Sequence, residues 1–152
     1  MNILVVDDSN TFRSLIKALL KKEGFSSLRF CESATKAYEV LEIGQMDSSG
    51  TSIDLILMDL NMPEIDGIEA CTHIKSIAAF HDIPIIMLTG SDDASSIEEA
   101  FAAGAHDYIK KPPNKNELLA RIRAALALKA EIDLRKAQTE KLKKTSDKLK
   151  KA

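Results

Sequence analysis

Residues 3–9 read Ile3-Leu4-Val5-Val6-Asp7-Asp8-Ser9, four aliphatic residues followed at once by two carboxylates. A near-continuous aliphatic run of this length is typical of a strand that is buried on both faces of a parallel sheet. Strong aliphatic runs recur at 53–58 and 83–88, and weaker ones lie at 28–31 and 106–109. The chain is therefore expected to contain five strands.

Apolar residues at helical spacing fill the intervals between these strands. We expect helices over 9–22, 33–43, 65–79, 92–103 and from 114 onward, with an irregular polar loop over 44–52. Ser9 is placed to cap the first helix, and Gly24 is placed to end it. Because parallel neighbours need crossover connections, this alternation predicts an α/β fold with helices on both faces of one sheet.

Composition sets the broad class of protein. The 152 residues are 45% hydrophobic and 29% charged, which is the balance of a soluble globular chain. No apolar run approaches the ~18 residues of a membrane span, and the acidic start lacks the basic flank of a signal peptide. Cys31 and Cys71 form no close pair, so we expect reduced thiols, a cytoplasmic location and no membrane contact.

Polar residues follow four of the predicted strands. Asp7-Asp8 follow the first, Asp59 the third, Thr89 the fourth and Lys111 the fifth. Functional groups of doubly wound sheets gather beyond the carboxyl ends of the strands, so these side chains are expected to meet at one edge.

Three carboxylates at one edge repel one another unless something compensates their charge. Taken alone, Asp7 or Asp8 could equally be a helix cap or a solvated loop residue. Together, the oxygen ligands suit a hard divalent cation such as Mg²⁺. Lys111 supplies the opposite charge, Thr89 supplies a hydroxyl donor, and a carboxylate at the centre can act as a nucleophile toward phosphorus.

The ordered motifs resemble those of the receiver domain of two-component response regulators. They are Leu4-Val5-Val6-Asp7-Asp8-Ser9, Asp59-Leu60-Asn61-Met62-Pro63-Glu64-Ile65-Asp66-Gly67, Thr89-Gly90 and Lys111-Pro112. The resemblance covers residues 1–124 and implies a flavodoxin-like, chemotaxis-regulator-like sheet in the order 2-1-3-4-5. One departure is Gly90, which stands where the family usually has alanine.

The resemblance also implies a role for each acidic residue. Asp59 would accept a phosphoryl group, and Asp8 would bind Mg²⁺ directly. Asp7 would act in the same cluster, often through water, while Asp59 and the backbone carbonyl of Asn61 would complete the protein ligands. Mn²⁺ would be able to replace Mg²⁺.

The remaining motif residues are expected to respond to the phosphoryl group. Thr89 would hydrogen-bond a phosphoryl oxygen, and Lys111 would form an ion pair with it. Tyr108 would be the switch aromatic, although a half-buried edge residue is the alternative interpretation. The resemblance and the sharp turn after the fifth strand predict a cis Lys111–Pro112 bond, and Gly67 is expected to relieve a turn.

The implied function is that of a phosphoacceptor, which takes its phosphoryl group from a histidine kinase or a histidine phosphotransfer protein. It would not be an enzyme toward external substrates, because a phosphatase with an aspartyl nucleophile would want an acid at Asn61. A flavodoxin-like FMN protein is disfavoured, because Asp7-Asp8 occupy its phosphate loop and would repel a phosphate that lacks a bound metal. A docking receiver that is never phosphorylated remains the other alternative.

Residues 125–152 continue the helical pattern beyond the expected domain. Residues 129–152 carry a net charge of +5, against −7 for residues 1–128. A heptad seam is formed by Leu128, Ile132, Arg135, Thr139, Leu142, Ser146 and Leu149. The seam favours a weak parallel coiled-coil dimer, with a solvated single helix as the alternative.

This helical extension resembles the linkers that precede cyclase, kinase or phosphatase output domains. We therefore expect a fragment of a longer protein, with a stand-alone receiver as the competing interpretation. The basic residues are expected to form a solvated helix face. No recognition-helix pattern follows the domain, so no direct contact with nucleic acid is expected.

Overall fold

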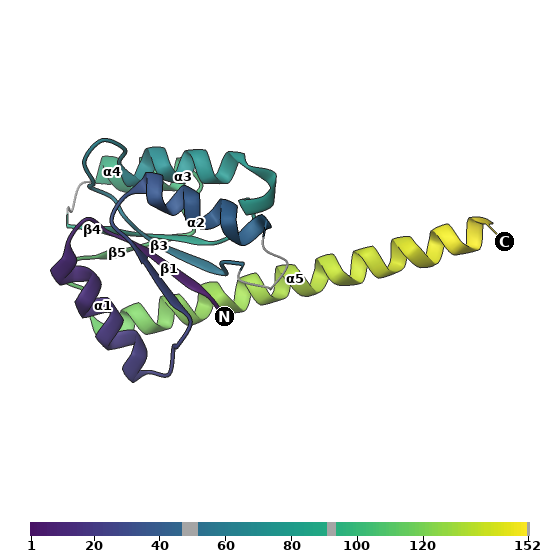
Figure 1. Ribbon diagram of the computed structural model, residues 1–152, viewed down its shortest axis with the longest axis horizontal. Coiled ribbons are helices and arrows are strands. Elements are labelled where there is room, and N and C mark those ends of the chain that lie inside the picture. Colours follow the sequence, from purple (N-terminus) through teal and green to yellow (C-terminus); the bar gives the residue numbers. More distant parts are fainter. Residues whose placement is uncertain (47–51, 91–93, 152) are drawn as a thin grey trace.

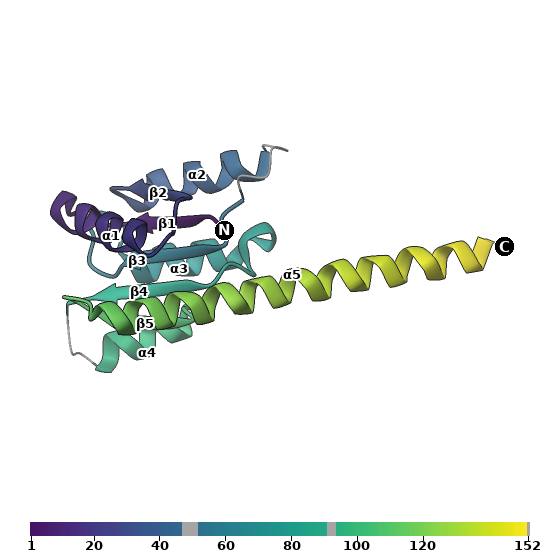
Figure 2. The same ribbon diagram turned by 90° about the horizontal axis from the view of Figure 1, so that it is seen from below.

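The computed structural model of the chain describes residues 1–46, 52–90 and 94–151. Its five parallel strands lie in the order β2-β1-β3-β4-β5 (Figure 2). The strands are β1 Ile3–Val6, β2 Leu28–Cys31, β3 Leu55–Asp59, β4 Ile85–Thr89 and β5 Asp107–Lys110. The helices are α1 Asn10–Lys22, α2 Ala34–Met46, α3 Gly67–Ser76, α4 Ala94–Ala102 and α5 Lys115–Lys151, with a 3-10 turn at Ala78–Phe80. The predicted fold class and strand order are confirmed.

Helices cover both faces of the sheet. α1 and α5 lie on one face, and α2, α3 and α4 lie on the other (Figure 1). Successive side chains of β1 point to opposite faces, so Ile3 and Val5 join the core under α1 and α5, while Leu4 and Val6 join the other core. Every residue of β1, β3 and β4 is buried, which explains their near-continuous aliphatic sequences.

Local hydrogen bonds decide where the helices begin. The Ser9 hydroxyl accepts from the backbone N–H of Phe12 at 3.2 Å, so Ser9 caps α1 as predicted. α3 was expected over 65–79, but it begins at Gly67 because the Asp66 carboxylate accepts from the N–H of Glu69 at 2.8 Å. A 3-10 turn then follows it.

α2 is longer than its sequence suggests. It was expected to end at residue 43, but it continues through Gly44 to Met46. An isolated glycine costs a helix about 1 kcal/mol relative to alanine without necessarily ending it. The predicted loop at 44–52 is therefore helical at its start, and residues 47–51 lie outside the described residues.

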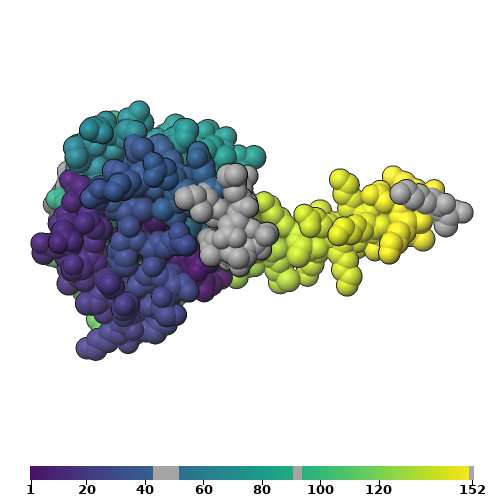
Figure 3. All heavy atoms as spheres, in the orientation of Figure 1, coloured from purple at the N-terminus to yellow at the C-terminus, as the bar shows by residue number. Residues whose placement is uncertain are grey.

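α5 is one uninterrupted helix of 37 residues, as the sequence predicts. The side-chain oxygen Oδ1 of Asn114 caps it by accepting from the backbone N–H groups of Asn116 and Glu117. Its first part packs on the sheet, and the rest extends beyond the domain (Figures 2 and 3). Within the described residues, no helix combines the length and hydropathy that a membrane span requires.

Two ion pairs fasten α5 near the amino-terminal edge of the sheet. Lys129 lies 3.8 Å from Asp54, which precedes β3, and Lys136 pairs with Asp82, which precedes β4. A cavity of about 280 Å³ lies between this part of α5 and the domain. The projecting part of the helix therefore starts beyond Lys136.

The loop between β3 and α3 brings two backbone segments unusually close together. The residue with a positive φ in this loop is Glu64, at 69°, so Gly67 does not relieve the turn in the way expected from the sequence. A Cβ at Gly67 would instead lie 2.4 Å from the carbonyl oxygen of Asp59 and 2.9 Å from the Cα of Leu60. Gly67 is required because the start of α3 packs directly on the end of β3.

We expect Gly67→Ala to lower the free energy of unfolding by about 1–3 kcal/mol, because backbone atoms cannot move aside as a flexible side chain can. Gly90→Ala is the matched control, since a Cβ there would meet no atom within 4 Å. Urea unfolding of both variants measures the difference. Equal stability of the two variants would contradict the proposed backbone clash.

Candidate functional site

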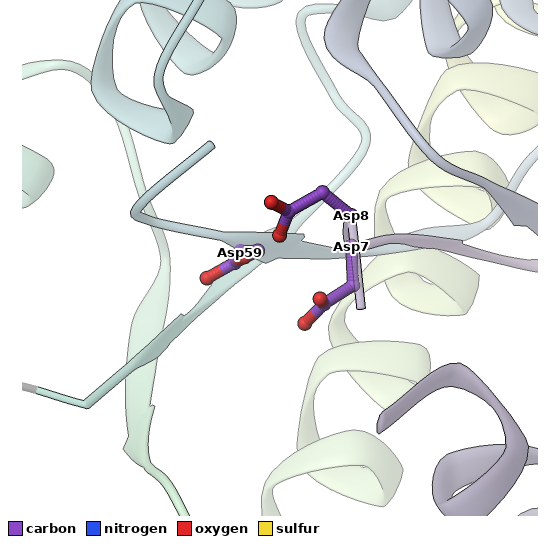
Figure 4. Close-up of side chains that lie close together, drawn as sticks. All are labelled: Asp7, Asp8 and Asp59. Carbon is purple, nitrogen blue, oxygen red and sulfur yellow. The ribbon is translucent and has the colours of Figure 1, made fainter. Parts of the chain in front are cut away.

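The predicted site residues lie at the carboxyl-terminal edge of the sheet. Asp7 and Asp8 follow β1, and Asp59 is the last residue of β3. One carboxylate oxygen from each of the three lies within 4.8 Å of the others, and Figure 4 shows these side chains gathered around the strand ends. The acidic cluster predicted from the sequence is present in the fold.

Two of these carboxylates are deeply buried. Asp7 is 0% exposed and Asp59 is 4% exposed, whereas Asp8 is exposed to solvent. Buried charges of the same sign destabilise a fold unless a counter-charge and hydrogen bonds compensate them. The structure supplies both kinds of compensation.

Lys111 provides the counter-charge from the loop after β5. Its ammonium nitrogen lies 2.7 Å from Asp7 Oδ2 and 3.2 Å from Asp59 Oδ1. The backbone N–H of Lys111 donates to the carbonyl oxygen of Thr89 at 2.7 Å, which ties this loop to the end of β4. The predicted direction of Lys111, back across the sheet edge toward Asp59, is confirmed.

Backbone N–H groups supply the remaining hydrogen bonds. The N–H of Ser9 donates to Asp7 Oδ1 at 2.8 Å, and the N–H of Asn61 donates to Asp59 Oδ1 at 3.3 Å. Both donors lie two residues beyond the carboxylate that they contact, so each carboxylate is oriented by its own loop.

Burial and the neighbouring charge of Asp7 raise the pKa of Asp59 to about 6, despite the opposing effect of Lys111. Burial alone would lower the pKa of Lys111, but Asp7 and Asp59 outweigh it and raise that pKa. The cluster thus holds more negative charge than one ammonium group balances.

The donor set fits a divalent cation. Three carboxylates and one ammonium group leave a net charge of −2 when all are ionised, and every donor is an oxygen. Mg²⁺ binds through a small number of carboxylates and retains several waters. The exposed Asp8 leaves the cluster open to solvent on one side, as a hydrated ion requires.

Comparison with known proteins agrees with this geometry. The sequence pattern that defines the response regulator receiver domain matches residues 3–123. The chain belongs to this family. It is 41% identical over 126 residues to the transcriptional regulatory protein YvrH of Bacillus subtilis, covering 82% of this chain and 48% of that protein. It is 34% identical over 112 residues to the chemotaxis protein CheY1 of Helicobacter pylori, covering 74% of this chain and 86% of that protein.

A solved structure has a similar fold. It is described as a probable two-component system response regulator/GGDEF domain protein, with a TM-score of 0.74 and 31% identity. The match covers 84% of this chain and 50% of the other. The chain thus spans about half the length of the GGDEF domain protein and of YvrH, and most of the length of CheY1.

Two further predicted residues of the receiver lie on β4 and β5. Thr89 is 2% exposed at the end of β4. Tyr108 on β5 is half-buried, and its ring meets that of Phe101 on α4 edge to face, with the ring centroids 6.0 Å apart. The Lys111–Pro112 peptide bond is cis, as predicted.

The sequence did not identify two residues that contact the site, Arg13 and Phe12. The guanidinium group of Arg13 donates to the carbonyl oxygen of Asp7 at 2.6 Å. The ring of Phe12 lies under the Lys111 ammonium group, 4.2 Å from ring centroid to nitrogen. In sequence, Phe12 is an apolar position of α1 at helical spacing, and nothing distinguishes it from a core residue.

The raised pKa of Asp59 predicts how the stability of the metal-free receiver depends on pH. The pKa is about 6 in the folded chain against an ordinary 3.8, so the folded state binds more protons between these values. The contribution of Asp59 to the free energy of unfolding therefore falls as pH rises from about 4 to about 6.

Asp59→Asn removes this penalty, and we expect it to raise the free energy of unfolding at pH 7 by roughly 1–3 kcal/mol. Urea unfolding in a chelator, at several pH values, measures the difference from wild type. Asp147→Asn, on the exposed part of α5, is the control. A variant that gains nothing at pH 7 would show that burial of the Asp59 carboxylate is not costly.

Proposed function

We propose that Asp59 accepts a phosphoryl group from the phosphohistidine of a histidine kinase or of a histidine phosphotransfer protein. A carboxylate oxygen of Asp59 attacks phosphorus, the P–N bond to the imidazole breaks, and its electron pair stays on the imidazole nitrogen. The observation that supports this most is the convergence of Asp7, Asp8 and Asp59 opposite Lys111.

The proposed metal ligands are Asp8, Asp59 and the backbone carbonyl of Asn61, with Asp7 acting through water. Bound Mg²⁺ would offset charge on the phosphoryl oxygens and hold them against the carboxylate. Mn²⁺ offers similar oxygen chemistry and is proposed to substitute for it.

Thr89 and Lys111 are proposed to contact the phosphoryl group of the phosphorylated state. Lys111 would exchange its contact with Asp59 Oδ1 for a phosphoryl oxygen, and the Thr89 hydroxyl would donate to another. Tyr108 would turn inward as Thr89 is drawn toward the phosphoryl group. Its edge-to-face contact with Phe101 links this movement to α4. The receiver would thus act through its conformation and not as an enzyme on other substrates.

Incubation with acetyl phosphate or phosphoramidate and Mg²⁺ tests the phosphoacceptor role. We expect the intact mass to increase by one phosphoryl group, because Asp59 belongs to the acidic cluster and lies 3.2 Å from the Lys111 ammonium group. Asp59→Asn should abolish the increase, and a chelator should prevent it in wild type.

Asp147→Asn, remote from the site, should be phosphorylated as fast as wild type. Persistent labelling of Asp59→Asn would disprove the assignment of Asp59. Labelling of wild type at full rate in the chelator would disprove the role of the metal.

We propose further that residues 125–152 connect the receiver to an output domain through a parallel pair of helices. The relative with a GGDEF domain shows one kind of output that joins a receiver of this kind. Leu142 and Leu149 are 71% and 74% exposed, whereas Leu128 and Ile132 are half-buried against the domain. The free part of the seam therefore lies beyond Ile132.

Charges flanking the seam favour the parallel orientation. When Leu142 occupies a heptad d position, the e positions are Lys129, Lys136, Lys143 and Lys150, and the g positions are Glu131, Gln138 and Thr145. Parallel helices place e opposite g of the partner, so Lys143 and Lys150 would meet the partner's uncharged Gln138 and Thr145. Antiparallel helices would place the lysines opposite one another. Polar Arg135, Thr139 and Ser146 within the seam would keep the pairing weak.

We expect sedimentation at increasing concentration to show a weak dimer, and Leu142→Lys to abolish it by placing like charges at the seam. Leu134→Lys is the matched control. Leu134 is also exposed, at 59%, but it occupies a c position outside the seam. Monomeric wild type at high concentration, with and without phosphorylation, would eliminate the coiled-coil proposal. Equal effects of the two substitutions would eliminate this register.

A further inference from the structure

The ammonium group of Lys111 has a partner besides the two carboxylates. Its nitrogen lies over the ring of Phe12, 4.2 Å from the centroid, while Asp7 and Asp59 contact it at 2.7 and 3.2 Å. The face of an aromatic ring carries partial negative charge and attracts a cation within about 6 Å. The attraction is stronger where water is largely excluded, and the Lys111 side chain is only 22% exposed.

Ser9 contacts both Phe12 and Asp7 and helps to position each of them. The Ser9 N–H donates to Asp7 Oδ1, and the Ser9 hydroxyl accepts from the N–H of Phe12. The Phe12 ring then contacts Lys111, and Lys111 contacts Asp7. These contacts form a closed loop that links the start of α1 to the segment after β5.

A core residue with no further role is the simpler interpretation of Phe12. Its ring is half-buried and packs against the cluster between the sheet, α1 and α5. Leucine would satisfy that requirement, since the ordinary needs of this position are size and hydrophobicity. Only an aromatic ring adds attraction for the ammonium group.

We propose that Phe12 is a positioning residue, which holds the Lys111 ammonium group beside the phosphoryl acceptor before and after phosphoryl transfer. This inference rests on the proposed function of Asp59. When a phosphoryl group occupies the site, the ammonium group must leave Asp59 Oδ1 for a phosphoryl oxygen. Attraction to a ring face has no single hydrogen-bond direction, so it persists through that movement. The ring also adds no formal charge to a cluster that already holds three carboxylates.

The test compares phosphorylation rates from acetyl phosphate at saturating Mg²⁺. We expect Phe12→Leu to slow phosphorylation about two- to tenfold, the range expected for loss of one partly desolvated cation–π contact. Phe12→Tyr should retain a rate closer to wild type than the leucine variant does. Phe25→Leu is the matched control, because Phe25 is also half-buried against the same core cluster but lies beyond the other end of α1.

Fluorination of the Phe12 ring separates positioning from packing. Successive fluorine atoms at this residue weaken the negative face of the ring and change its volume little. We expect the rate to fall stepwise with the number of fluorine atoms, while the thermal unfolding midpoint changes no more than in Phe25→Leu. A purely structural role would not produce this graded dependence.

Each result bears on one proposal. A fluorinated series with unchanged rates, or a leucine variant as fast as wild type, would overturn the role of Phe12 and leave Asp59 as the acceptor. Failure of wild type itself to gain a phosphoryl group would overturn the proposed function. A leucine variant too unstable to assay would leave the fluorinated series to decide.

Discussion

Two buried carboxylates share one ammonium group at the end of this sheet, and much of the surrounding structure serves that arrangement. Asp7 directly follows β1 and Asp59 ends the neighbouring β3, so the parallel register itself brings their charges together. Lys111 reaches them from β5, two strands beyond β3 in the sheet order, with the backbone at its base bonded to the end of β4. Displacing any one of these strand ends would leave a buried charge without its partner, which is far more costly than losing a surface ion pair.

The imbalance of charge has a functional consequence. A cluster that was fully neutralised by its own residues would be more stable, but it would offer nothing to a cation or to a phosphoryl group. Burial and Asp7 raise the pKa of Asp59 to about 6, so the metal-free fold carries a cost at neutral pH. A cation that offset the repulsion between Asp7 and Asp59 would remove this cost, and the free energy released would add to its affinity. A ligand that binds only the folded state also stabilises that state. The receiver therefore carries a cost in stability at a site whose oxygen donors fit a divalent cation.

Sequence alone was sufficient for the fold and for the acidic cluster, because both depend on strong local signals. Aliphatic runs marked β1, β3 and β4, and the carboxyl ends of parallel strands must meet at one edge. The details that sequence did not reveal depend on contacts between distant segments. Phe12 looked like any core residue of α1 until the fold placed Lys111 over its ring. Gly67 looked like a turn residue until the backbone of Asp59 was found against it.

The path from the site to the projecting helix is short. Lys111 lies four residues before α5, and Arg121 on the second turn of α5 pairs with Asp107 of β5 at 2.6 Å. A displacement of this segment would therefore act on the base of α5 directly, without an intervening chain of side chains. Near its middle the helix is fastened by the ion pairs of Lys129 and Lys136 with the domain.

Beyond Lys136, the helix continues for roughly 22 Å at 1.5 Å per residue. A tilt of about 10° around this point would move its tip sideways by roughly 4 Å. A sideways shift of that size would change the spacing between two paired helices, whose seam depends on close contact between their a and d positions. If α5 pairs with a second copy as proposed, its length would turn a small movement at the carboxyl-terminal edge of the sheet into a larger change of helix spacing at the far end.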